Sequence, residues 1–172
     1  LVGVINADTI LNFPDFRSSE RTYQMLSQVS GRAGRGNIKG DVIIQTFNPD
    51  NYSIELSKTH NYVDFFNKEI KIRKDLKYPP YYFISLIKIG SKDYNLALSE
   101  SKKIVNYIKE NISEDMIVLG PSVSGVSRVN KIYYFQIIIK FRNKEKMREI
   151  LNNVSDLENN NKVSISIDIN PC

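Results

Sequence analysis

Two adjacent prolines, Pro79 and Pro80, divide the chain into parts with different sequence patterns. Before them, residues 51–77 have the apolar spacing of helices, and that spacing stops at the prolines because a residue before proline disfavours the α conformation. After them, short apolar runs alternate with amphipathic ones. We therefore predict three segments: an α/β portion at 1–50, a helical connector at 51–81 and a separate α+β domain at 82–172.

The first fifty residues have the pattern of a strand, a helix and a second strand. Apolar runs at residues 2–5 and 41–47 are typical of buried parallel strands. Between them, Ser18 or Ser19 can cap a helix whose apolar side chains recur every three residues. Strand, helix and strand together form the unit that builds parallel sheets, so we expect an α/β fold with a parallel sheet here.

Asp8 directly follows the first apolar run and is a candidate site residue. In open α/β sheets, ligands gather at the carboxyl ends of the strands, where this residue is expected to lie. Aspartate is also a common turn former, because its side chain can bond the nearby backbone. The sequence is compatible with both interpretations of this carboxylate.

The pattern of residues 82–172 predicts a domain with the element order β-α-β-β-α-β. Asp93 and Asn143 can cap the two helices, and a polar stretch at 122–131 is expected to be a loop. This order is that of the split-βαβ, ferredoxin-like arrangement, in which both helices cover one face of an antiparallel sheet. Many unrelated functions use that fold, so the fold alone does not indicate one. The expected strands are 83–89, 116–119, 132–141 and 163–169.

Composition excludes several kinds of site. The 172 residues carry a net charge of +5 and contain one histidine, His60, and one cysteine, Cys172. Neither a disulfide framework nor a zinc cluster can be built from these residues, and a reducing cytoplasm is the expected compartment. The missing initiator methionine suggests a fragment of a longer protein. The excess of positive charge lies entirely within residues 51–172, which is compatible with nucleic-acid binding and also with an ordinary solvated surface.

The most specific chemical motif is Gln28-Val29-Ser30-Gly31-Arg32-Ala33-Gly34-Arg35-Gly36, at the end of the predicted helix. Side chains three residues apart project from one helical face, so Arg32 and Arg35 can reach a single target. Two guanidinium groups suit a polyphosphate whose charge increases during reaction. The alternative is a basic helix end that interacts with its own dipole.

With its flanks, this motif resembles motif VI of superfamily 2 helicases, whose pattern is Q-x-x-G-R-x-x-R. Gln28, Gly31, Arg32 and Arg35 occupy its four defined positions. The longer pattern resembles the PriA family of bacterial primosomal helicases, which restart stalled replication forks. The other matching segments are Val4-Ile5-Asn6-Ala7-Asp8, Asp15-Phe16-Arg17-Ser18-Ser19-Glu20-Arg21, Val42-Ile43-Ile44-Gln45-Thr46, Arg73-Lys74, Tyr78-Pro79-Pro80, Val118-Leu119-Gly120-Pro121 and Asp168-Ile169-Asn170-Pro171.

The resemblance implies a fold and an activity. Residues 1–50 would be the end of the second RecA-like lobe of an ATP-dependent 3′→5′ DNA helicase, followed by its C-terminal domain. Arg32 and Arg35 would contact the ATP γ-phosphate, Gln28 would position the nucleotide or the attacking water, and Gly31 would bind the nucleotide beside them. ATP and Mg²⁺ would be cofactors of the full-length protein. The first lobe and a zinc-binding module would lie outside this chain, which alone is expected to be inactive.

The resemblance also implies partners: branched and single-stranded DNA, single-stranded-DNA-binding protein and other primosome proteins. An alternative is that the chain acts as a non-catalytic binding module. Arg128 and Lys131 could meet DNA phosphates, and Tyr134 could stack on bases, whereas Tyr133 and Phe135 are expected in the core. The module could instead hold the acidic, hydrophobic tail of single-stranded-DNA-binding protein, or only brace the helicase lobe.

Overall fold

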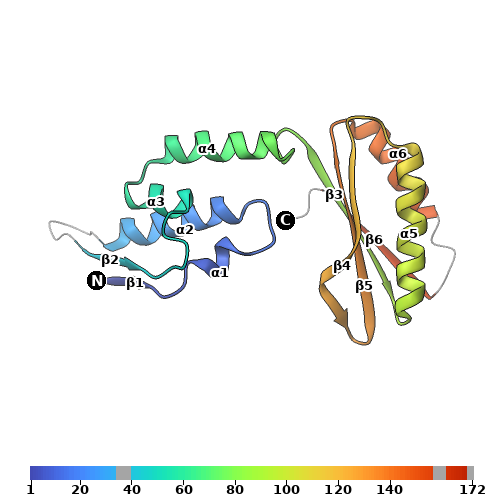
Figure 1. The fold of residues 1–172 in the computed structure, drawn as a ribbon, viewed down its shortest axis with the longest axis horizontal. Coiled ribbons are helices and arrows are strands. Elements are labelled where there is room, and N and C mark those ends of the chain that lie inside the picture. The colour runs from blue at the N-terminus through green and yellow to red at the C-terminus, as the bar shows by residue number, and fades with distance from the viewer. Residues whose placement is uncertain (34–39, 157–161, 170–172) are drawn as a thin grey trace. The chain divides into compact units, whose positions relative to one another are not determined.

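The computed structural model describes residues 1–33, 40–156 and 162–169. They belong to two compact units, Leu1–Leu76 and Lys77–Cys172 (Figure 1). A small parallel sheet in the first unit and a four-stranded antiparallel sheet in the second make the chain a mixed α/β protein. The first unit contains β1 (Val2–Val4), α1 (Asp8–Leu11), α2 (Ser18–Ala33), β2 (Val42–Ile44), α3 (Tyr52–Lys58) and α4 (Tyr62–Asp75).

The first unit is a strand–helix–strand arrangement supported by two further helices. Strands β1 and β2 pair in parallel, with Val2 opposite Val42, as the sequence predicts. Leu26 of α2 is fully buried and packs with Ala7 and Ile54 into a small core. Helices α3 and α4, which were predicted to form a helical connector, belong to this unit.

Asp8 ties the ends of the two parallel strands together. Its buried carboxylate accepts hydrogen bonds from the Phe47 backbone N–H (2.9 Å), the Asn48 side-chain amide (2.7 Å) and the Thr46 hydroxyl (3.1 Å). These bonds, the Phe47 one foremost, lower the pKa of Asp8. Of the two interpretations left open by the sequence, the structure supports the structural one.

We expect the stability of the first unit to depend on the charge of Asp8. The lowered pKa means that the carboxylate stabilises the fold above its ordinary value of 3.8 and loses this effect as the pH falls through the lowered value. Asp8→Asn should therefore lower the urea midpoint at neutral pH and have a smaller effect in strong acid. A difference between variant and wild type that does not change with pH would contradict this role.

The second unit is a sheet with both helices on one face. It contains β3 (Phe83–Ser91), α5 (Tyr94–Asn111), β4 (Ile117–Val129), β5 (Ile132–Phe141), α6 (Lys144–Asp156) and β6 (Val163–Ile169). The strand order is β4-β5-β3-β6, all antiparallel, and α5 and α6 cover one side (Figure 1). Alternate strand residues such as Ile87 and Ile137 are fully buried and pack against Ile104 and Ile108 of α5.

One expectation for this unit is wrong. The stretch 122–131 was expected to be a loop, but β4 continues to Val129 and joins β5 through Asn130 and Lys131. Both turn residues have positive φ, 51° and 66°, as a tight two-residue hairpin turn requires. Two register shifts along the β4–β5 pair accommodate the irregular stretch, so cross-strand pairing outweighs the weak local strand signal.

Candidate functional site

Helix α2 places Gln28, Gly31 and Arg32 on its last two turns. Its buried stripe, which includes Tyr23 and Leu26, faces the core. Helical spacing puts Gln28 and Arg32, one turn apart, on the opposite and exposed side. The structure records no hydrogen bond or ion pair for either of these two side chains with the described part of the chain.

These features leave Gln28 and Arg32 available to a ligand. A planar guanidinium and a carboxamide that share one helical face can bind phosphate oxygens and orient a nearby water. Arg35, the other predicted arginine of the motif, lies outside the described residues, as do Gly34 and Gly36. The joint action of Arg32 and Arg35 therefore stays a prediction.

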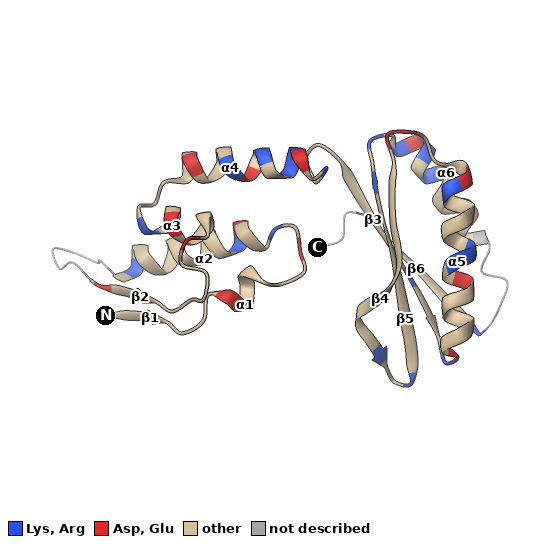
Figure 2. Ribbon diagram, in the orientation of Figure 1, with Lys and Arg blue, Asp and Glu red and all other residues tan. Residues whose placement is uncertain are grey.

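The β4–β5 hairpin separates the residues that were predicted to bind DNA. The Arg128 guanidinium lies 4.8 Å from the ring centroid of Tyr133, which also makes an edge contact with Tyr94 at the start of α5. Arg128 is thus on the helix side of the sheet. Lys131 is exposed at the hairpin turn, where the ribbon in Figure 2 has the blue of basic residues.

Tyr134 lies on the sheet face opposite the helices. It pairs with Gly90 of β3, and a Cβ added at Gly90 would come within 2.8 Å of the Tyr134 ring. Glycine therefore lets this ring lie against the strand backbone. Lys88 and Gln136 point to the same face because strand residues alternate. The structure therefore brings Tyr134 together with Lys88 and Gln136, and not with Arg128.

A group of cations over aromatic rings lies at the start of β3 and the end of β5, and the sequence pattern did not predict it. The Lys140 ammonium is 3.5 Å from the Tyr78 ring centroid, and burial, followed by repulsion from Lys77, lowers the pKa of Lys140. Arg142 lies 4.8 Å from the ring centroid of Tyr82. Cation–π contacts of this kind hold the polypeptide that enters β3 against the sheet.

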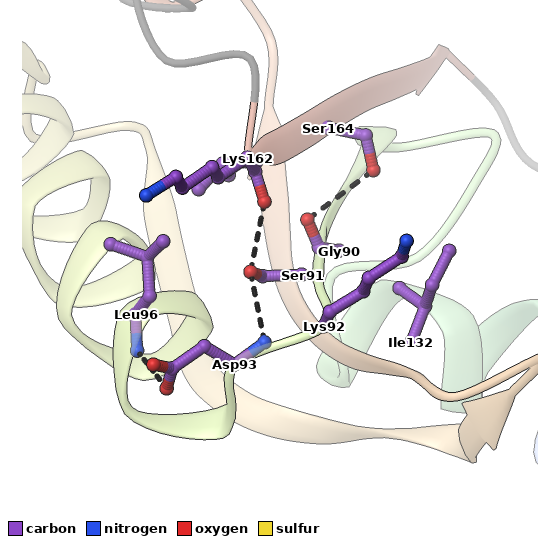
Figure 3. A pocket seen from close by; sticks show the side chains of 9 residues that line it. Gly90, Ser91, Lys92, Asp93, Leu96, Ile132, Lys162 and Ser164 are labelled. Carbon is purple, nitrogen blue, oxygen red and sulfur yellow. Dashed lines mark hydrogen bonds between the residues drawn. The ribbon is translucent and has the colours of Figure 1, made fainter.

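A cavity of about 600 Å³ opens where β3 ends and β6 begins (Figure 3). Its lining combines the apolar side chains of Leu96, Ile132 and Val163 with the lysines Lys92 and Lys162. The Ser91 hydroxyl donates to the Lys162 carbonyl at 2.9 Å and accepts from the Asp93 N–H at 3.2 Å. The Asp93 carboxylate is occupied as the N-cap of α5.

Neither a cluster of metal ligands nor a membrane-spanning helix occurs in the described ranges. No group of three or more His, Cys, Asp or Glu side chains in them is placed to hold a metal ion. None of their helices is both long and apolar enough to cross a bilayer.

Comparison with known proteins assigns the chain to a family. The model of the primosomal protein N C-terminal domain matches residues 74–172. The replication restart protein PriA of Bacillus subtilis is 42% identical over 99% of this chain, and that of Borreliella burgdorferi is 34% identical over 99%. The chain spans only 22% and 26% of those two proteins. It therefore belongs to the PriA family of replication restart proteins, and residues 74–172 match the C-terminal domain of that family.

Proposed function

We propose that this chain is the C-terminal part of an ATP-dependent 3′→5′ DNA helicase that recognises stalled replication forks and restarts replication. The single observation that carries the proposal is the exposed Gln28–Arg32 face of α2, in a chain 42% identical to a replication restart protein. Such a protein would act in the cytoplasm with other primosome proteins. ATP-dependent strand displacement by the intact protein on a model replication fork tests the proposal.

The two units have distinct roles in this proposal. The first unit is the end of a RecA-like lobe, which its parallel β1–β2 pair and intervening helix support. The second unit is a split-βαβ, ferredoxin-like domain, which the strand order β4-β5-β3-β6 supports. In this proposal the first unit takes part in ATP hydrolysis, and the second unit binds DNA or a protein partner.

Arg32, with Arg35 and Gln28, supplies half of a nucleotide site in this proposal. The guanidinium of Arg32 neutralises charge on the terminal phosphate, and Gln28 orients the nucleotide or the attacking water. ATP with Mg²⁺ would be the substrate, and hydrolysis of the bond between its β- and γ-phosphates, with ADP as the leaving group, would drive the motor. The sequence contains no G-x-x-x-x-G-K-[ST] phosphate loop, so the other half of the site must come from a different lobe, and residues 1–172 alone do not hydrolyse ATP. Zinc would belong to that other part of the protein.

A second candidate function is binding by the second unit. The open sheet face, with Tyr134 and Lys88, combined with Lys131 at the hairpin, has the aromatic and cationic groups that single-stranded DNA requires. The cavity with Lys92 and Lys162 over apolar walls suits an acidic peptide with an apolar end, such as the tail of single-stranded-DNA-binding protein. The two surfaces would bind different ligands, so substitutions in them should affect different binding reactions.

We expect two substitutions to separate the two ligands. Lys131→Glu in the intact protein should weaken forked-DNA binding. It should also make the fall of log affinity with log salt less steep by about 1, because one phosphate contact is lost. Lys162→Glu should weaken binding of an acidic peptide with an apolar C-terminus. Fluorescence anisotropy at several salt concentrations measures both, and each variant is the control for the other ligand. Equal loss of both ligands in both variants would contradict the assignment.

A further inference from the structure

Helices α2 and α4 are joined by a partly buried ion triad. The Arg73 Nε donates to Glu69 on its own helix at 2.7 Å, and the Arg73 Nη2 donates to Glu20 on α2, also at 2.7 Å. Glu69 is buried, and its second carboxylate oxygen accepts the Tyr52 hydroxyl at 2.5 Å. One guanidinium therefore links carboxylates that are 49 residues apart in the sequence.

Aromatic packing holds this triad in one geometry. The rings of Tyr23 on α2 and Phe65 on α4 stack at 4.2 Å with an interplanar angle of 13°. The Arg73 guanidinium lies 5.2 Å from the ring centroid of Phe16, just before α2. Burial, together with the bond to Glu69, raises the pKa of Tyr52 to about 12, so this donor stays protonated at physiological pH.

Stability alone does not explain an ion triad whose central carboxylate, that of Glu69, is buried. Well-packed apolar side chains of similar size can stabilise a fold as much as buried charges do, because the charges lose hydration. What the planar fork of Arg73 adds is a fixed orientation between two helices. Lysine, with a single flexible ammonium, cannot hold two carboxylates in the same way.

The triad connects one end of each helix to a different part of the chain. Glu20 lies in the first turn of α2, whose last turns carry Gln28 and Arg32. Arg73 lies in the last turn of α4, four residues before Lys77, where the second unit begins. If α2 moves as a rigid helix, a displacement of its Arg32 end would tilt it, and the bond from Glu20 to Arg73 would transmit that tilt to the end of α4.

We propose that Arg73 is a positioning residue that couples the nucleotide-contacting helix α2 to the junction with the C-terminal domain through its bonds to Glu20 and Glu69. This inference rests on the proposed function. Arg73 itself touches no nucleotide: its role is to make the state of the Arg32 end of α2 felt at the junction, so that DNA binding and ATP hydrolysis influence each other.

Two variants and one matched control test this coupling in the intact protein. Glu20→Gln removes the negative charge that Arg73 contacts on α2. Arg73→Lys keeps the positive charge but removes the planar guanidinium fork. The control is Arg21→Gln, because Arg21 is on the same turn of α2 and bonds Asp15 at 3.1 Å without reaching α4. Both test variants weaken the same bond, the one between Arg73 and Glu20. The double variant should therefore lose no more coupling than either single variant.

Three measurements are made on each variant. In the nucleotide-free protein, hydrogen exchange should report a folded α4 in all of them. Adenylyl imidodiphosphate should change amide exchange at residues 69–76 in wild type and in Arg21→Gln, and leave it unchanged in Glu20→Gln and Arg73→Lys. The ratio of ATP turnover with and without forked DNA should fall about fivefold or more in those two variants.

A nucleotide-dependent change in exchange and an unaltered stimulation ratio in both test variants would overturn the coupling role. Loss of α4 protection in the nucleotide-free variants, with the stimulation ratio intact, would also overturn it and leave the triad purely structural. In either case the proposed function stands as long as Arg32→Ala still abolishes hydrolysis. If Arg32→Ala hydrolyses ATP normally, the proposed function fails, and the coupling inference fails with it.

Discussion

Arg32→Ala in the intact protein should reduce DNA-stimulated ATP hydrolysis by about a thousandfold, the scale of an arginine that stabilises a phosphoryl-transfer transition state. The side chain is exposed on the last turn of α2, so its removal should leave the fold and DNA affinity unchanged. Steady-state turnover with forked DNA measures the effect. Arg32→Lys should remain strongly impaired because an ammonium lacks the planar fork.

A neighbouring arginine provides the control for this prediction. Arg17 lies outside α2 and bonds Asp15 through its Nε at 3.2 Å, so Arg17→Gln removes a similar charge away from the Gln28–Arg32 face. It should hydrolyse ATP within a few-fold of wild type. Near-normal turnover in Arg32→Ala, or an equal loss in Arg17→Gln, would contradict the assignment of Arg32 to the nucleotide site.

Ile137→Ala should destabilise the second unit by about 2–5 kcal/mol, because it removes buried methyl groups and leaves a cavity. Ile137 is fully buried at the centre of β5 and belongs to the core between the sheet and α5. Amide exchange at β3 and β5 measures the loss for this unit separately, since a chain of two units need not unfold in one step.

The matched control is the same substitution at an exposed position. Ile169, at the end of β6, is 58% exposed. Ile169→Ala should therefore change the stability of the second unit by about 0.5 kcal/mol or less. A similar loss for both substitutions would mean that the sheet face toward α5 and α6 is not the core of this unit.

Local sequence signals predicted much of this fold. Asn61 caps α4 by accepting the Asp64 N–H at 3.2 Å, and Asp93 caps α5, both as expected from their side chains. The alternation of β5 correctly predicted that Phe135 would be buried. Each of these signals acts within a few residues or along one element, which is why a single sequence reveals it.

Other features depend on contacts between distant segments. The path of β4 beyond Leu119 follows from its pairing with β5, and its own residues read as a loop. Short helix α1, at Asp8–Leu11, is too brief to show helical periodicity. The Glu20–Arg73 bond joins residues 53 positions apart, and charge alone could not distinguish Arg73 from the exposed lysines around it.

The candidate site divides in the same way. The motif at Gln28, Gly31 and Arg32 was found from its spacing, and α2 presents it on an exposed helical face. Arg128, Lys131 and Tyr134 were predicted to act together because they are close in sequence. In the sheet, however, Arg128 and Tyr134 lie on opposite faces. Periodicity assigns residues to faces only once the strand boundaries are known.

Strand displacement by the intact protein on a model replication fork tests the central claim most directly. The account predicts ATP-dependent unwinding with 3′→5′ polarity by wild type, no unwinding by Arg32→Ala, and neither unwinding nor ATP hydrolysis by residues 1–172 alone. Unwinding that proceeds without ATP, or ATP hydrolysis by residues 1–172 alone, would contradict the claim that α2 carries half of a helicase nucleotide site.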